Sequence, residues 1–233
     1  MFMRIARTAG FAGLLAALLL TLLQSLWVTP LILHAETFEN SAPAVEQPHG
    51  HEAGVAEHHH DSQAWAPADG WQRVLSTSGA NLVMAVGFAL ILAGLYSLRA
   101  PGRSRDGLLW GLAGFASFSL APALGLPPEL PGTAAADLAL RQYWWIGTVG
   151  ATAVGLALIA FGRHWVLRVL GALLLAVPHL VGAPQPEVHQ SLAPVALGQQ
   201  FIFASLFTHG LFWLVLGSVS AWLYRRPGAT QAS

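Results

Sequence analysis

The sequence predicts an all-α integral membrane protein, a bundle of six transmembrane helices with a long His-rich loop on one side. Two observations lead to this prediction. The chain of 233 residues is 55% hydrophobic and only 9% charged, whereas a soluble domain carries about 25% charged residues. The apolar residues also gather in long runs, and the arginines between those runs alternate in a way that fits six membrane crossings. We therefore expect a single membrane domain over residues 1–233.

A helix needs about 20 apolar residues to cross the hydrocarbon core, because unpaired backbone groups are costly there. Six stretches meet or approach that length: Gly10 to Leu33, Ala80 to Leu98, Leu108 to Leu126, Trp144 to Phe161, Val166 to Gly182 and Phe201 to Leu223. The first is longer than the core of a secretory signal and lacks a small-residue cleavage site, so we expect it to remain as an anchor. The fifth is the shortest, and Arg168 near its start can reach the interface from the first turn.

The arginines set the predicted orientation. With six spans and both termini in the cytoplasm, only Arg73 and Arg141 lie outside, in agreement with the positive-inside rule. The inner segments then hold Arg4, Arg7, Arg99, Arg103, Arg105, Arg163, Arg168, Arg225 and Arg226. Without the fifth span, the last two arginines would lie outside, so the arginine count favours six.

Several functions are excluded by missing residue types. The chain has no lysine, so it has no P-loop for nucleotide hydrolysis. It has no cysteine for a thiolate metal site or a redox pair. Its formal net charge of zero offers nothing to attract nucleic acid. We expect a lipid-embedded protein that is not an enzyme and uses no nucleotide.

The long outer segment from His34 to Gly79 carries the strongest sign of metal chemistry. Five histidines lie close together in it, interleaved with glutamates: His49, His51, His58, His59 and His60. Neutral imidazole binds borderline divalent ions, and a flexible tract of this kind prefers copper, nickel and zinc over cobalt because it imposes no geometry. The first half of the segment is poor in large aliphatic residues, so we expect it to be disordered. The alternative is a solvated linker that binds no metal.

Further donors fall at the outer ends of the predicted helices. They are His34, Glu36, Glu129, His179 and His209, with Glu187 and His189 in the last outer loop. Nitrogen and oxygen donors on facing helices could form a site for a divalent cation. Placing a polar side chain in lipid costs free energy, so a histidine within the membrane is a candidate for function. Each histidine could equally be bonded to a neighbouring carbonyl.

Three prolines lie in the outer parts of spans, namely Pro30, Pro122 and Pro178. Each removes a helical hydrogen bond and frees the carbonyl four residues earlier, on Leu26, Phe118 and Leu174. Such carbonyls face cations in transporters with broken helices, although kinks can also simply shape a bundle. Gln24, midway along the first span, would be the next polar group along an inward path, or else it forms a plain interhelical hydrogen bond.

Small residues predict close helix packing. Gly107 and Gly111 form one small-residue pair, and Gly147, Gly150 and Gly155 form a similar face on the fourth span.

Several stretches carry a resemblance to a known family. They are LWVTPLILHAETFE (26–39), WAPADGWQR (65–73), GLLWGLAGFASFSLAPALGLPPELPG (107–132), RQYWW (141–145) and PHLVGAPQPEVHQ (178–190). Together with the His-rich loop, they resemble the predicted cobalt transporter subunit family CbtA across nearly the whole chain.

This resemblance implies a component of cobalt uptake in the bacterial inner membrane, serving cobalamin synthesis beside a small single-span partner, CbtB, that also carries histidines. It implies metal-binding roles for the loop histidines, for His179 in its Pro-His element, and for Glu36 and Glu129 within motifs. His209 is less typical of the family. The family is described with about five spans, whereas the arginine count favours six. The transported ion would be Co²⁺, with Ni²⁺ or Zn²⁺ as alternatives.

Two other functions fit the residues. One is a metal-binding accessory protein that conducts nothing. The other is a membrane cytochrome in which His179 and His209 hold a haem between helices.

Overall fold

The computed structural model describes residues 1–41, 67–68 and 70–226, and the chain is helical along most of that length. The elements follow the order α1 (Phe2–Leu23), η1 (Gln24–Val28), α2 (Thr29–Ser41), α3 (Trp71–Leu98), α4 (Ser104–Phe115), η2 (Ala116–Leu120), α5 (Ala121–Ala123), α6 (Leu138–Phe161), α7 (Trp165–Val181) and α8 (Val195–Arg225). Among the described residues, extended pairing is limited to one bridge between Thr133 and Ser191. The all-α membrane class is confirmed.

Each expected span coincides with a helical segment. Among the described residues, four helices are long and apolar enough to cross a membrane: Phe2–Ser41, Trp71–Leu98, Leu138–Phe161 and Val195–Arg225. The helix Trp165–Val181 is apolar but shorter, and the third expected span corresponds to the continuous run α4–η2–α5. Six crossings by these segments stay a prediction.

The helices extend beyond the apolar runs, which changes the outer segment expected from His34 to Gly79. Residues from His34 to Ser41 are the end of α2, and those from Trp71 to Gly79 are the start of α3. The apolar run sets only the part of a helix that sits in lipid, and flanking residues of adequate helix propensity continue it into water. The five loop histidines lie outside the described residues. Disorder was expected for the first half of the segment, and this was wrong for residues 34–41, which continue the helix; the rest of that half lies outside the described residues.

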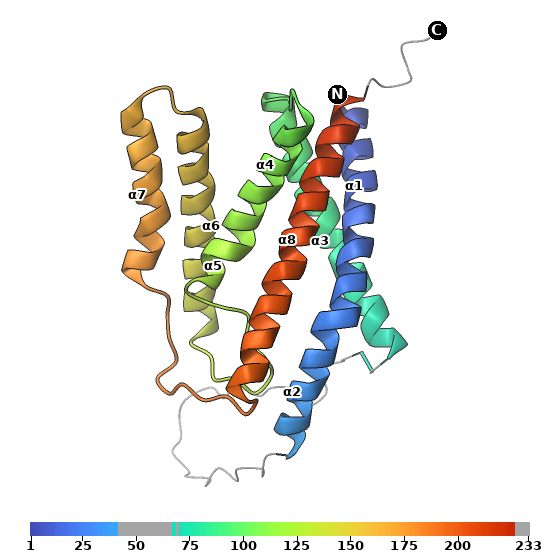
Figure 1. Ribbon diagram of the computed structural model, residues 1–233, viewed down its shortest axis with the longest axis vertical. Helices are drawn as coiled ribbons and strands as arrows, with labels where there is room; N and C mark the ends of the chain where they lie inside the picture. The colour runs from blue at the N-terminus through green and yellow to red at the C-terminus, as the bar shows by residue number, and fades with distance from the viewer. Residues whose placement is uncertain (42–66, 69, 227–233) are drawn as a thin grey trace, which may run out of the picture.

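Figure 1 shows the helices running along one long axis, with the connections gathered at two ends. The N-terminus, the α3–α4 connection, the α6–α7 connection and the end of α8 share one end. The segments at that end carry nine of the eleven arginines, so we call it the Arg-rich end. Arg73 and Arg141 begin α3 and α6 at the opposite, Arg-poor end. The predicted partition of arginines therefore matches the fold.

Asp106 lies at the Arg-rich end in the first turn of α4. Its carboxylate accepts hydrogen bonds from the backbone N–H groups of Arg103 and Gly102, at 2.9 and 2.8 Å. These bonds stabilise the ionised form, and they hold the pKa of Asp106 below its usual value. The carboxylate thus caps the helix.

Helices α1, α3, α4 and α8 form the core, in which small residues allow close approach. A Cβ on Gly111 would lie 2.4 Å from the Trp213 oxygen, and one on Gly217 would lie 2.4 Å from the Gly107 oxygen. The close packing expected of Gly107 and Gly111 is therefore confirmed, with α8 as the partner helix.

Helices α6 and α7 form a hairpin beside this core. The α6 helix of this hairpin packs against η2 and α5. Gly155 packs tightly, since a Cβ there would lie 2.8 Å from the Gly171 oxygen of α7. The expectation was wrong for Gly147 and Gly150, which have no heavy atom within 4 Å of an added Cβ. Both glycines are exposed on α6, so no neighbour among the described residues presses on them.

Two of the three prolines adjoin a π-helical turn. In η1 the Thr29 N–H bonds to the Gln24 oxygen, five residues back, directly before Pro30. The same pattern joins the Ala121 N–H to Ala116 before Pro122. Because proline has no N–H, the backbone hydrogen bonds of the helix shift by one residue at these positions. Such π-turns are frequent at functional sites. The residues whose carbonyls were expected to be freed, Leu26 and Phe118, lie within these turns, whereas Pro178 is accommodated inside α7.

Candidate functional site

Glu36, an expected metal ligand, forms an ion pair that joins two helices at the Arg-poor end. It lies on α2, and Arg73 lies in the first turn of α3. The Arg73 guanidinium donates from both terminal nitrogens, at 2.8 Å to one carboxylate oxygen and 3.3 Å to the other. Both side chains are about 30% exposed. The forked geometry matches guanidinium to carboxylate, so the pair fixes the approach of α2 to α3.

Glu129 forms a second ion pair of the same kind. It lies in the connection after α5, and Arg141 lies at the start of α6, with 3.1 Å between the nitrogen and the oxygen. These side chains are also about 30% exposed. Sequence reasoning treated the two glutamates as ligands and missed the two arginines. The sequence did contain a signal for them. Arg73 is the last residue of one motif stretch and Arg141 is the first residue of another, and these two are the arginines predicted to lie outside.

Three of the candidate histidines, His34, His179 and His209, lie on three different helices, α2, α7 and α8. The exposed ring of His34 lies 5.4 Å from that of Phe38 on its own helix. His179 is exposed beside Trp144, with ring centroids 6.1 Å apart. His209 is half-buried on α8, where its Nδ1 lies 2.8 Å from the Ser205 oxygen. This contact is a bond to a neighbouring carbonyl, which is the alternative to metal binding by His209.

No group of three or more His, Asp or Glu side chains that could hold a metal ion is present within the part of the chain that the structure describes. The expected ring of donors is therefore not assembled by described residues alone. Its carboxylates are engaged by arginines, and two of its histidines face outward. Metal binding by His34, Glu36, Glu129, His179 and His209 stays a prediction.

A pocket of about 380 Å³ lies where the π-turn η1 meets the start of α3. It is lined by Gln24, Val28, Thr29, Ile32, Pro67, Arg73 and Thr77. Gln24, which the sequence suggests as the next polar group along an inward path, lies in the pocket wall. One glutamine and two threonines supply neutral oxygen atoms, and Arg73 links the pocket to the Glu36 ion pair. The pocket wall thus combines polar groups with the apolar side chains of Val28, Ile32 and Pro67.

Behind this pocket, a polar contact joins α1 to α3. The Asn81 amide donates to Thr21 Oγ1 at 3.1 Å and to Gln24 Oε1 at 2.7 Å. Asn81 is only 6% exposed, so both bonds are shielded from water. They orient Gln24 and hold the two helices in register.

Replacing Asn81 with alanine should destabilise the protein by about 1 kcal/mol, the size of an interhelical hydrogen-bond contribution in membranes. The shift should be visible as a lower Tm of the detergent-solubilised protein. Gln142→Ala, at an exposed position on α6, is the matched control and should leave Tm unchanged. Equal Tm values for the two variants would show that the Asn81 contact contributes nothing.

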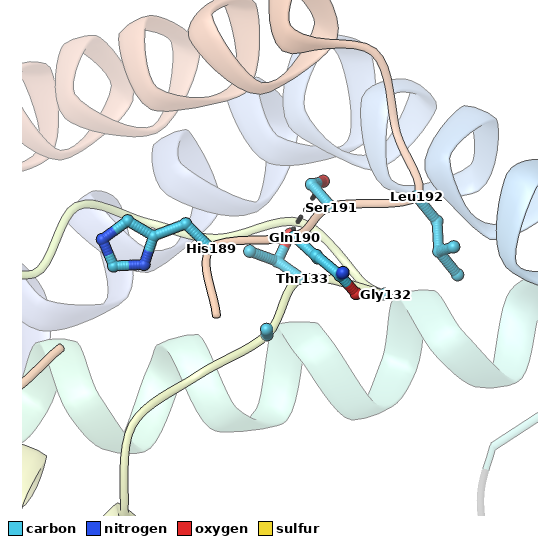
Figure 2. A pocket seen from close by; sticks show the side chains of 7 residues that line it. Gly132, Thr133, His189, Gln190, Ser191 and Leu192 are labelled. Atoms are coloured by element: carbon cyan, nitrogen blue, oxygen red, sulfur yellow. Dashed lines mark hydrogen bonds between the residues drawn. The ribbon is translucent and has the colours of Figure 1, made fainter. Parts of the chain in front are cut away.

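Two connections meet elsewhere at the Arg-poor end, around an open pocket of about 760 Å³ (Figure 2). The Ala134 N–H bonds to the Gln190 oxygen and the Leu192 N–H to the Gly132 oxygen, at 2.9 and 3.2 Å. The hydroxyls of Thr133 and Ser191 lie 3.2 Å apart between them. The contact ties the α5–α6 connection to the α7–α8 connection, with His189 at its edge.

Comparison with known proteins gives one match. The family model described as "Probable cobalt transporter subunit (CbtA)" matches residues 2–225. No curated protein and no solved structure matches the chain.

Proposed function

This chain belongs to the CbtA family of probable cobalt transporter subunits, and we propose that it captures Co²⁺ with its His-rich loop and passes the ion through the helix bundle. The family match over nearly the whole chain carries this proposal. The multi-pass helical fold agrees with a membrane subunit, and the segregation of arginines agrees with a protein that has two chemically different ends. We infer that the Arg-poor end faces outward, with both termini in the cytoplasm of a bacterium whose inner membrane holds the protein.

The proposed path begins at the loop histidines, which are largely neutral at pH 7 and bind a divalent ion from outside. The ion then meets the carboxylates Glu36 and Glu129, with His34, His179 and His209 as further donors on α2, α7 and α8. The pocket at η1 and the Asn81–Gln24 contact provide polar groups deeper in the bundle. Release occurs at the Arg-rich end.

The membrane potential can drive this movement. A doubly charged ion moving inward gains about 4.6 kcal/mol per 100 mV, twice the single-charge value. That free energy supports an accumulation of roughly a thousandfold. Because the chain lacks a P-loop lysine, we propose that it consumes no nucleotide itself.

Metal-specific uptake tests the proposal. Cells expressing the chain, alone or with the small single-span subunit CbtB that we propose as its partner, should accumulate radioactive cobalt above cells carrying an empty vector. Parallel assays with nickel and zinc identify the preferred ion. Background uptake under both conditions would overturn the proposal.

His179→Ala tests the histidine that the family resemblance implies as a ligand. In cells expressing equal amounts of protein, it should lower cobalt uptake. Uptake equal to that of the unaltered chain would remove His179 from the path.

The loop separates a transporter from a metal-binding accessory protein. Deleting residues 46–61 from a transporter should raise the apparent KM for Co²⁺ about tenfold, because the tethered histidines raise the local ion concentration, and should leave the maximal rate intact. Concentration-dependent uptake of radioactive cobalt measures both quantities. An accessory protein would lose its whole effect on uptake when these residues are removed.

The structure gives the cytochrome alternative no support. Helix α7 packs on α6, and Figure 1 shows α6 and α4 between α7 and α8. His179 and His209 therefore lie on helices that are not packed as neighbours. Purified protein without a Soret band would exclude a haem.

A further inference from the structure

The two arginines at the Arg-poor end both hold glutamates that the proposed function assigns to the cation. Of the eleven arginines in the chain, Arg73 and Arg141 begin α3 and α6 at this end, and each lies within 3.1 Å of a carboxylate oxygen. Arg73 contacts both carboxylate oxygens of Glu36, so a divalent cation that binds this carboxylate competes with the guanidinium for them.

We propose that Arg73 is the resident counter-ion of Glu36, which an arriving divalent cation displaces and which returns to release the ion. This inference rests on the proposed function and adds a residue with a defined role in it. Only ionic contacts are exchanged. The carboxylate stays ionised, and its partner alternates between a guanidinium and the metal ion.

The exchange is physically reasonable because the ion pair is only moderately shielded. Both side chains are about 30% exposed, and ion pairs in contact with water are weak. A divalent cation carries twice the charge of a guanidinium and approaches a carboxylate oxygen to about 2.1 Å, compared with 2.8 Å for the Arg73 nitrogen. The Coulomb attraction to the carboxylate is therefore larger for the cation than for the guanidinium.

The structure also provides room for the exchange. Arg73 lines the pocket of about 380 Å³ at η1, and one water molecule takes up about 30 Å³. The pocket is thus larger than the volume of six water molecules. Oxygen atoms of Gln24, Thr29 and Thr77 in the pocket wall can accept hydrogen bonds from those waters or from the guanidinium.

The return of Arg73 prevents the ion from being trapped. A partly buried carboxylate without a counter-ion would bind a divalent cation tightly and release it slowly. When the guanidinium competes for the same oxygens, the affinity is lower and the ion can move on toward Gln24 and Asn81. The side chains of Glu129 and Arg141 are exposed to the same extent as those of Glu36 and Arg73, and the nitrogen–oxygen distance is similar. This second pair joins the connection after α5 to the start of α6.

The test is the kinetics of cobalt uptake by cells that express the full chain with its partner subunit. Arg73→Gln should lower the apparent KM about fivefold, the equilibrium equivalent of a partly exposed ion pair, and should also lower the maximal rate. Arg141→Gln should shift KM in the same direction. Arg163→Gln, at an exposed position of the Arg-rich end, is the matched control and should leave KM unchanged.

Two further variants separate exchange from other roles. In a Glu36→Gln background, adding Arg73→Gln should not lower KM, because the competition needs the carboxylate. Arg73→Lys keeps the charge without the forked geometry, and its KM should lie between those of the unaltered chain and Arg73→Gln. It serves in place of Arg73→Gln if that variant fails to accumulate in the membrane.

Three results would overturn the inference. An unchanged KM with a lower maximal rate in Arg73→Gln would mean that the arginine only supports the fold. An equal fall in KM with and without Glu36 would mean that it only repels cations from a distance. Absence of uptake by the unaltered chain would overturn the proposed function, and this inference with it.

Discussion

Replacing Gly217 with valine is expected to destabilise the protein by about 3 kcal/mol, at the upper end of the usual cost of overpacking a core. A Cβ at this position would lie 2.4 Å from the Gly107 oxygen and 2.6 Å from the Gly111 nitrogen. Both are backbone atoms, so no side chain can rotate aside and the whole of α4 must move away from α8. Tyr96 also donates to the Gly217 oxygen at 3.3 Å, and that bond would be strained as well.

For a chain of this length, such a loss corresponds to a fall in Tm of about 10 °C. Thermal unfolding of the detergent-solubilised protein, together with the fraction that elutes as a single species, measures it. Gly150→Val on α6 is the control, since an added Cβ there meets nothing within 4 Å. It should change stability by less than about 0.5 kcal/mol. If both variants unfold at the same temperature, close approach of α4 and α8 does not stabilise the bundle.

The second large effect is expected for Glu36→Gln, which should reduce cobalt uptake at low concentration about a hundredfold. Loss of even an outer partner of a metal ligand costs about 10- to 100-fold, and Glu36 is proposed to contact the ion itself. The substitution keeps the size of the side chain but removes its charge. It also removes the carboxylate charge that Arg73 contacts at 2.8 Å.

Glu39→Gln provides the matched comparison. Glu39 lies one turn further along α2 and is exposed, so the same change of charge occurs there without breaking the pair with Arg73. Its uptake should stay within about twofold of the unaltered chain, as expected for a screened surface charge. Initial uptake rates, corrected for the amount of protein in the membrane, give the comparison. Equal rates for the two variants would remove Glu36 from the path.

The sequence was sufficient to predict the class of fold and the position of each helix. Apolar runs marked six helical segments, and the arginine pattern placed nine of eleven arginines at one end. The small residues Gly107 and Gly111 marked a close interface. Each of these features is written locally, because hydrophobicity, charge and side-chain size act on the segment that carries them.

These local features of the sequence could not predict the lengths of the helices or the pattern of backbone hydrogen bonds within them. The first helix runs on to Ser41 because hydropathy marks the lipid boundary and not the end of the helix. The π-turns before Pro30 and Pro122 needed the backbone path, since a proline can be accommodated by a kink, a break or a shift in register. Pro178 in α7 shows that the same residue type need not produce a π-turn.

The sequence by itself determined that this chain is a membrane-embedded helical protein with opposite chemistry at its two ends, and it carried the motifs of its family. Only the tertiary structure decided which partners those motifs have. Glu36 and Arg73 are 37 positions apart, and Gly111 meets an α8 residue more than a hundred positions away, whereas Gly147 meets nothing. Such pairings depend on how each helix is rotated about its axis and which neighbour it packs against, and these are properties of the whole bundle that no single segment encodes.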